Sequence, residues 1–448
     1  LVPESQEISM GQQGAQEVDA TMGVYDNASL NAYVDGIGKA LAAQSERPNL
    51  PWSFKVIDDP LVNAFALPGG PIYVTRGLLA HMTSEAQLAA VMGHEVGHVT
   101  AKHSVGQLSK ATLAQVGLVV GSAVSETVAA LGQIGGAGMQ LLMLRYGRED
   151  ERQSDDLGFK YSINLGYEVR EMPGVFMTLK RVGEASGGQS LPSWMSSHPA
   201  PDERVERINK RIAETNPPKG KTNKDEFLAI INNMVYGPDP RHGYFEGAAF
   251  KQPEMKFQVT MPAGWKKQNM AAAVVAQAAD GKAGLQLTLA KAASPAEAMQ
   301  KFTATEGVAN VTPVQVQLQV PGNVAQFTAK TEQAEVGGLV AFLSHEGKTF
   351  QILGLAPLAS APSVEPLIRA TVSSFGPLTD AAALSVQPAR LKVIAAPQAM
   401  TVAELAAKYP GLPAERLAIM NQLNVDSRIE AGQKVKVVEG KVREDNAP

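Results

Sequence analysis

The chain has 448 residues, enough for two or three domains of ordinary size. Its 40 Lys and Arg residues against 44 Asp and Glu residues give a net charge of −4, which argues against a nucleic-acid-binding protein or a polybasic membrane binder. Cysteine is absent, which excludes disulfides, thiolate nucleophiles and cysteine zinc sites, so any metal must be bound by carboxylates or by the seven histidines.

The first part of the chain is predicted to be mainly helical, with a short β section. The spacing of apolar residues predicts helices over 4–23 and 29–45, and alternating residues predict strands over 52–57, 63–67 and 71–74. A long helix should follow, because Ser84 is a suitable N-cap and Gln87 is its capping-box partner. A further helix is predicted over 149–164.

Thr127–Leu144 is the longest candidate for a membrane span. It lacks charges but contains four Gly and two Gln, so it is a marginal transmembrane helix. We interpret it as a buried or surface-resting helix.

After a linker over 215–225, the predicted elements change from mainly helices to mainly strands. Strands are predicted over 257–261, 284–292, 314–320, 323–330, 339–345 and 349–355, with helices after Ser294 and over 364–374. The last part reads as strand 391–395, helices 402–408 and 413–422, and strand 434–438. The predicted fold class is α+β multidomain, with domains at 1–215, 216–380 and 381–448.

The strongest chemical signal is the run His94-Glu95-Val96-Gly97-His98. On a helix, residues four apart share a face, so both imidazoles can bind one ion while Glu95 lies beside it. The alternative is a solvated helix with two surface histidines. The apolar neighbours Leu88 and Val91 disfavour it, because they bury the helix and a buried ionisable group needs partners.

A catalytic zinc ion needs a third protein ligand and an open position. His103 lies five residues after His98 and rotates off the face, so it is predicted to be a surface residue. His198 is another candidate, and Glu151 and Asp155 share a face of the second helix, where one can ligate while the other orients a ligand. The residues alone leave this choice open.

Together, these residues resemble the gluzincin metallopeptidases related to CAAX prenyl protease and HtpX, in particular their soluble bacterial periplasmic members. The matching stretches are Asn63–Gly70, the HExxH run, Glu151-xxx-Asp155, and Ser197-His198-Pro199 followed by Arg204. The resemblance covers residues 4–212 and implies a mainly helical zincin-type domain with a short β-sheet and one Zn²⁺ per chain.

The resemblance also implies how the metal is held. His94, His98 and Glu151 would be the zinc ligands. Asp155 would support a ligand by a hydrogen bond, and Arg204 would brace the loop that carries His198.

Catalytic and substrate-binding roles follow in the same way. Glu95 would take a proton from a zinc-bound water and pass it to the leaving amine. His198 would donate a hydrogen bond to the oxyanion of the tetrahedral intermediate. Asn63, Ala64 and Phe65 would form or border an edge strand that pairs with an extended substrate.

The two later domains carry weaker resemblances. The middle one is similar to small PsbP-like α+β modules, on the stretch Phe257–Trp265. The last one resembles a βααβ LysM-like module, on its element order, Asn421 and the run Gly432–Val437. That resemblance implies contact with peptidoglycan, although Tyr409 is the only aromatic residue there.

The sequence therefore predicts a zinc-dependent endopeptidase that hydrolyses unfolded or misfolded proteins in the bacterial periplasm or cell envelope. Its expected partners are protein or peptide substrates, with peptidoglycan as a further candidate and nucleic acid excluded. Membrane association stays open, without a clear transmembrane helix. The alternative is a non-catalytic or latent scaffold or chaperone of zincin fold, which binds cell wall or client proteins through its C-terminal domains.

Overall fold

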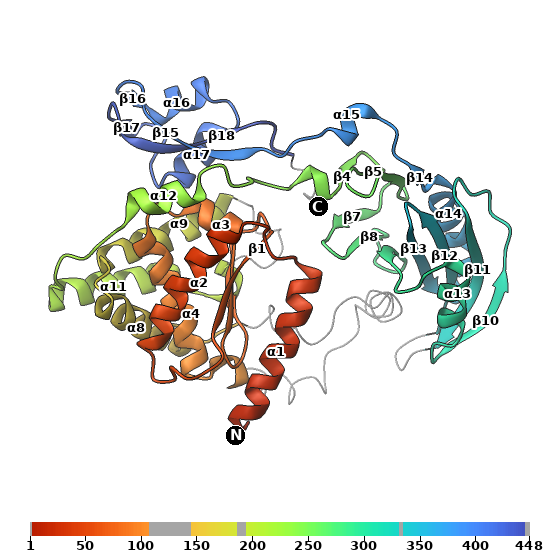
Figure 1. Ribbon diagram of the computed structural model, residues 1–448, viewed down its shortest axis with the longest axis horizontal. Coiled ribbons are helices and arrows are strands. Elements are labelled where there is room, and N and C mark those ends of the chain that lie inside the picture. Colours follow the sequence, from red (N-terminus) through yellow and green to blue (C-terminus); the bar gives the residue numbers. More distant parts are fainter. Residues whose placement is uncertain (1, 107–144, 186–193, 331–334, 444–448) are drawn as a thin grey trace. The chain divides into compact units, whose positions relative to one another are not determined.

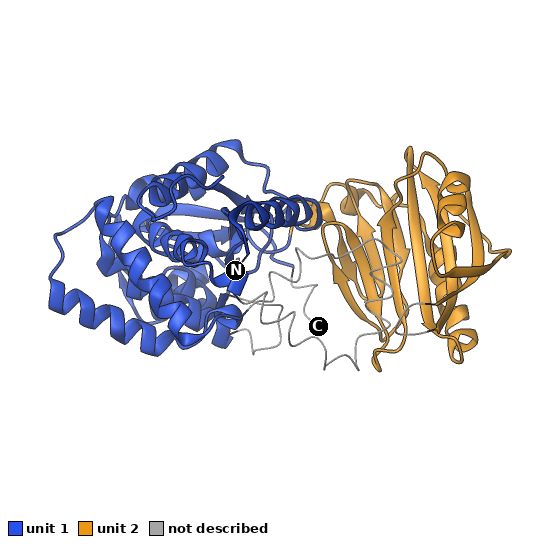
Figure 2. Cartoon of the chain, turned by 90° about the horizontal axis from the view of Figure 1, so that it is seen from below, with its two compact units in different colours: residues 1–114, 136–238, 388–443 blue, residues 115–135, 239–387, 444–448 orange. Residues whose placement is uncertain are grey.

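The computed structural model describes residues 2–106, 145–185, 194–330 and 335–443 (Figure 1). The candidate span Thr127–Leu144 lies outside these residues. The chain divides into two compact units (Figure 2), the first made of residues 1–114, 136–238 and 388–443, and the second mainly of residues 239–387. Within the described ranges, no helix is long and apolar enough to cross a bilayer.

The first unit is rich in helices, as the apolar spacing predicts. Its helices before residue 238 are α1 (Glu4–Thr21), α2 (Ala28–Ala43), α3 (Arg76–His81), α4 (Glu85–Thr100), α8 (Arg148–Asn164), η1 (Val169–Glu171), α9 (Met172–Ala185), α10 (Trp194–Ser197), α11 (Pro201–Thr215) and α12 (Lys224–Ile231). Its sheet contains β1 (Ser53–Ile57), β2 (Ala64–Ala66) and β3 (Pro71–Thr75) in the order β1-β3-β2. β3 pairs parallel with β1 and antiparallel with β2, so β2 is an edge strand.

The helix α4 begins where the sequence predicts. The hydroxyl of Ser84 accepts a hydrogen bond from the backbone N–H of Gln87 at 3.3 Å, which confirms the N-cap. The side chain of Gln87 reaches back to the N–H of Thr83 at 2.9 Å, one residue before the cap. Two donors at the start of the helix are thereby satisfied.

The helices α4 and α8 pack closely because glycines lie at their contact. A Cβ at Gly158 would lie 2.8 Å from the backbone nitrogen of His94, and a Cβ at Gly97 would lie 3.0 Å from Cα of Ser154. Any larger side chain would force the two helices apart. The close approach brings the acidic first turns of α8 beside the histidines of α4.

The segment 388–443 packs within the first unit, against the part formed by the earlier residues. Its elements are β15 (Arg390–Ala395), β16 (Met400–Thr401), α16 (Val402–Lys408), α17 (Ala414–Met420), β17 (Arg428–Ile429) and β18 (Lys434–Glu439). β15 pairs antiparallel with β18 around the two helices, so the predicted element order is confirmed. Leu405 and Leu417 belong to the same buried cluster as Leu88 and Val91 of α4.

The second unit contains a seven-stranded and a four-stranded sheet. The first has the order β10-β11-β12-β13-β9-β8-β7, from β10 (Val308–Pro313), β11 (Gly322–Lys330), β12 (Glu335–His345), β13 (Lys348–Pro357), β9 (Gly284–Leu289), β8 (Ala273–Gln277) and β7 (Lys266–Asn269). The second has the order β14-β6-β5-β4, from β14 (Gly376–Pro377), β6 (Phe257–Thr260), β5 (Ala249–Gln252) and β4 (Tyr244–Glu246). The helices are η2 (Pro240–His242), α13 (Pro295–Thr303), α14 (Ala361–Ser374) and α15 (Ala381–Leu384).

One predicted strand of this unit is wrong. Residues 314–320 form no strand, and β10 ends just before them at Pro313. The alternating residues Val314, Val316 and Leu318 are partly buried against the core of the unit. Prolines flank the segment and remove backbone donors, so the alternation here records burial rather than ladder pairing.

Candidate metal centre

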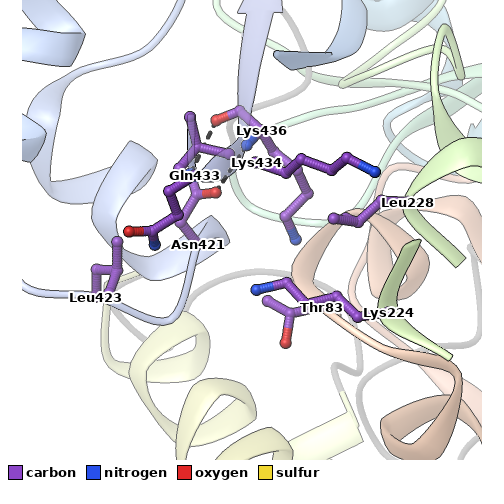
Figure 3. Close-up of a pocket in the computed structure, with 9 residues that line it drawn as sticks. Thr83, Lys224, Leu228, Asn421, Leu423, Gln433, Lys434 and Lys436 are labelled. Atoms are coloured by element: carbon purple, nitrogen blue, oxygen red, sulfur yellow. Dashed lines mark hydrogen bonds between the residues drawn. The ribbon is translucent and has the colours of Figure 1, made fainter. Parts of the chain in front are cut away.

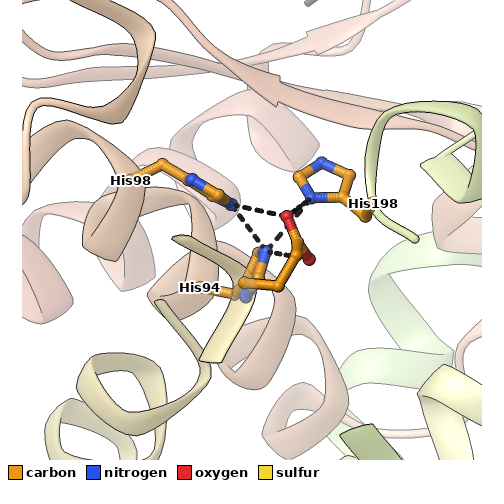
Figure 4. A group of neighbouring side chains, drawn as sticks. His94, His98 and His198 are labelled. Carbon is orange, nitrogen blue, oxygen red and sulfur yellow. Dashed lines mark hydrogen bonds and ion pairs between the residues drawn. The ribbon is translucent and has the colours of Figure 1, made fainter. Parts of the chain in front are cut away.

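Four buried side chains converge in the first unit. His94 and His98 come from α4, Glu151 from α8, and His198 from the loop after α10 (Figure 4). One ligand atom from each of them lies within 4.8 Å of all the others. The HExxH spacing thus brings both imidazoles to one point, and the fold adds a carboxylate and a third imidazole.

The donor atoms of this cluster suit a cation. Nδ1 of His94 lies 2.8 Å from Oδ1 of Asp155, so this nitrogen donates its proton and Nε2 keeps a lone pair. That Nε2 lies only 2.9 Å from Nε2 of His98, and Oε1 of Glu151 lies 3.3 Å from the latter atom. Two imidazole lone pairs and a carboxylate facing one another repel unless a positive ion lies between them, and nitrogen and oxygen are ligands that zinc accepts.

Arg204 supports the acids around the cluster. Its Nη2 lies 2.7 Å from Oδ1 of Asp155, and its Nη1 lies 2.7 Å from Oε2 of Glu151. Burial alone would raise the pKa of Asp155, but Arg204 and the hydrogen bond from His94 outweigh burial and lower it to about 2. For Glu151, the charges of His198 and Arg204 likewise outweigh burial and hold its pKa below the ordinary value. Both carboxylates are therefore ionised at neutral pH.

Glu95 lies beside the cluster rather than in it. The side chain is fully buried; its Oε1 is 3.3 Å from Nε1 of Trp194 and 3.5 Å from Nε2 of His198. Within the described ranges its Oε2 has no hydrogen-bond partner. A buried carboxylate with a free oxygen next to a metal site is placed to accept a proton.

His198 faces both the ligands and Glu95. Its Nδ1 lies 2.9 Å from Oε1 of Glu151 and 3.2 Å from Nε2 of His94. The indole of Trp194 stacks on its ring, with centroids 4.5 Å apart and planes inclined by 19°. The imidazole is therefore held in place from one side.

The predicted substrate-binding residues lie at the edge of the small sheet. Asn63 directly precedes β2, and Ala64 and Phe65 are its first two residues. The carbonyl of Val62 accepts a hydrogen bond from the backbone N–H of Trp194 at 3.2 Å. This bond ties the start of the edge strand to the segment that carries His198.

His103 is not a surface residue, and the prediction for it is wrong. It is 8% exposed, and its Nδ1 lies 3.0 Å from Nδ1 of His98 while its Nε2 lies 3.0 Å from Oε1 of Gln153. The spacing argument assumed that α4 continues, but the helix ends at Thr100 and Lys102 has a φ of 60°. This left-handed residue turns the chain back beneath the metal ligands.

Two aromatic residues of the site were not predicted. Tyr146 stacks on His98, with ring centroids 3.8 Å apart, and burial raises the pKa of its hydroxyl. Trp194 contacts both Glu95 and His198. It is one of only three tryptophans in the chain and lies four residues before His198, which is the signal that could have drawn attention to it.

Removing the imidazole of His103 is expected to weaken zinc binding. If His98 binds zinc through Nε2, its Nδ1–H donates to His103, and loss of such an outer partner typically costs about 10–100-fold in metal affinity. Competition with a chromophoric chelator would measure the effect in His103→Ala. His103→Gln, which keeps an acceptor, should lose less, and exposed His242→Ala should lose nothing. Equal affinity in His103→Ala and His242→Ala would contradict the assignment.

Comparison with known proteins agrees with this site. Residues 28–212, which contain all four converging side chains, match the family model of Peptidase family M48. Mitochondrial metalloendopeptidase OMA1 of Arabidopsis thaliana is 34% identical over 211 residues, covering 46% of this chain and 39% of the relative. Beta-barrel assembly-enhancing protease of Escherichia coli is 27% identical over 238 residues, covering 51% of this chain and 48% of the relative.

The comparison with solved structures gives weaker parallels. The solution structure of cyanobacterial PsbP from Synechocystis is 10% identical and covers 30% of this chain and 94% of that one, with a TM-score of 0.24.

Site and comparisons together identify residues 28–212 as a zinc metallopeptidase domain. Zinc is the metal of its centre, and the described ligand atoms fit it. The chain spans less than half of the length of the relatives compared.

Proposed function

We propose that this chain is an endopeptidase that hydrolyses unfolded or misfolded proteins of the bacterial cell envelope. The observation that carries the proposal is the convergence of His94, His98 and Glu151, with a buried Glu95 beside them whose Oε2 has no hydrogen-bond partner among the described residues. This arrangement places a metal site and a proton acceptor next to each other in the buried interior of the domain.

In this proposal His94, His98 and Glu151 hold the zinc ion. When bound, zinc supplies a Lewis acid that polarises the carbonyl of the scissile peptide and makes water more acidic. Glu95 accepts the proton of the attacking water and then delivers it to the nitrogen of the leaving amine, which contributes about 10²–10⁴-fold in rate. Trp194 keeps one oxygen of Glu95 oriented and leaves the other free for the proton.

His198 has two candidate roles. As a hydrogen-bond donor to the oxyanion it would promote the reaction. As a fourth ligand, binding through a ring nitrogen, it would complete the coordination of zinc, and a closed site is typical of non-catalytic centres. Its position 2.9 Å from Glu151 supports the alternative function of a latent or scaffolding zincin. His198→Ala separates the roles, because cleavage falls in the first case and rises in the second.

The edge strand β2 supports a preference for extended chains. An edge strand offers backbone donors and acceptors that pair with any peptide in extended form, so recognition depends little on sequence. The name of the Escherichia coli relative connects that protein with β-barrel assembly, which supports an envelope location for this chain, in the periplasm or at the cell wall. Contact with peptidoglycan through residues 388–443 is part of the same proposal, and co-sedimentation of the full chain with purified peptidoglycan tests it.

Removal of the metal is expected to abolish cleavage reversibly. A strong chelator should stop hydrolysis of casein by the full chain, because without a metal ion the scissile carbonyl is not polarised and the water that Glu95 deprotonates is not made more acidic. One equivalent of zinc should restore hydrolysis, and metal analysis should find about one zinc per chain. Undiminished cleavage after the metal has been removed would contradict the proposal. Zinc bound without cleavage of any unfolded substrate would favour the scaffold.

A further inference from the structure

The C-terminal segment contacts the start of α4 through one side chain. Nε2 of Gln422, in the turn after α17, donates to the carbonyl of His81 at 3.0 Å and to Oε1 of Gln87 at 2.8 Å. Nε2 of Gln87 donates back to Oε1 of Gln422, also at 2.8 Å. Gln87 is the residue that completes the N-terminal cap of α4, so this amide pair joins the segment to the first turn of the zinc-binding helix.

The backbone of Gln422 has an unfavourable conformation, which indicates that its contacts hold it there. Its φ is 59°, a left-handed conformation that glycine and asparagine adopt more readily than glutamine. Asn421, the preceding residue, fixes the turn to β18 by donating to the carbonyl of Lys436 and accepting from its N–H, both at 2.8 Å. The turn is therefore anchored on both sides.

Lys436 of β18 forms a second contact with the same region. It is 1% exposed, and its Nζ donates to the carbonyls of Ala80 and Met82 at 2.7 and 2.5 Å. These carbonyls belong to the end of α3, where a helix leaves acceptors unsatisfied, and the buried amine of Lys436 supplies donors to them although burial lowers its pKa. Figure 3 shows Lys436 and Asn421 around one small pocket with Thr83, which lies between α3 and α4.

Displacement at the first turn of α4 would reach the metal. Gln87, Val91, His94 and His98 follow one another along a face of a single continuous helix. The helix is buried along almost its whole length and packs against α8 at Gly158, so it moves as a rigid body. The orientation of its first turn therefore sets where the two imidazoles point.

We infer that Gln422 and Lys436 are positioning residues of the metal centre. Through them, the segment 388–443 holds α3 and the start of α4 so that His94 and His98 meet Glu151 at ligand distance. The segment thus helps to set the geometry of the metal centre. This inference rests on the proposed zinc site, and its main test does not depend on peptide cleavage.

The decisive variant is Gln422→Gly in the full chain. Glycine suits the left-handed backbone, so this change removes the amide pair without adding backbone strain and should leave the folded content unchanged by circular dichroism. We expect about 2- to 30-fold weaker zinc binding by chelator competition, the range for residues that are coupled to a site without contacting its ligands. Hydrogen exchange should become faster in peptides covering residues 80–92.

Further variants separate positioning from general stability. Lys436→Met should weaken zinc binding in the same direction, while Lys408→Met, at an exposed lysine of α16, should not. Gln87→Ala and Gln422→Ala should be non-additive in zinc affinity, because each removes the same amide pair. Where cleavage is measurable, Gln422→Gly should lower kcat and leave KM unchanged.

Two results would overturn the inference: unchanged zinc affinity and unchanged exchange in Gln422→Gly, or fully additive effects of Gln87→Ala and Gln422→Ala. If Lys436→Met does not fold, the Gln422 variants still decide the question. If the wild type cleaves no substrate, the proposed function fails, whereas the zinc and exchange measurements continue to test the positioning role.

Discussion

Replacing Glu95 with Gln is expected to reduce peptide hydrolysis by about 10²–10⁴-fold while zinc binding stays close to that of the wild type. Gln has the same shape and fits the same buried position, but its amide cannot accept the proton of the attacking water. Glu95 lies outside the set of ligand atoms, so the metal site should persist. Cleavage of casein or a quenched peptide gives the rate, and metal analysis gives the zinc content.

A matched control for this prediction lies on α8. Glu149 is exposed and forms a surface ion pair with Arg152 at 3.3 Å, so Glu149→Gln should change neither rate nor zinc content. Wild-type activity in Glu95→Gln would show that another group takes the proton. Loss of zinc in Glu95→Gln would assign the residue to the ligands and contradict the role given to it here.

Replacing Arg204 with Met is expected to have the largest effect on stability. Arg204 is 3% exposed and contacts Asp155 and Glu151. Its Cζ lies 4.6 Å from the ring centroids of both Phe176 and Trp194. Its loss leaves two buried carboxylates without their cation, and breaking a buried pair in this way costs about 3–5 kcal/mol. Chemical denaturation with and without zinc would measure the loss, which bound zinc should partly offset.

The control for Arg204 lies on the same helix. Arg207 pairs with Asp156 at the partly exposed face of α11, and such surface pairs contribute about 1 kcal/mol or less. Arg207→Met should therefore change the free energy of unfolding little. Equal losses in the two variants would show that the buried network around Asp155 has no special weight.

Much of the site could be predicted because it depends on local geometry. The i, i+4 spacing of His94 and His98 fixes their common face as soon as the segment is helical, and Ser84 with Gln87 marks where that helix begins. The error at His103 has a local cause as well, since a single left-handed residue, Lys102, ended the regular spacing. Residues 314–320 show the opposite error, in which a periodic pattern reports burial without a strand.

The sequence by itself determined the chemistry. Because the chain has no cysteine, the metal ligands must be nitrogen or oxygen atoms, and the HExxH run places two imidazoles and a carboxylate base on one helix. Only the tertiary structure decided which residues join that helix. Glu151 reaches the histidines because Gly97 and Gly158 let α8 approach α4, and Gln422 reaches Gln87 across 335 residues of sequence. The physical reason is that backbone dihedrals fix spacing within a helix, whereas the partners of a helix depend on how complete surfaces pack, which no local pattern records.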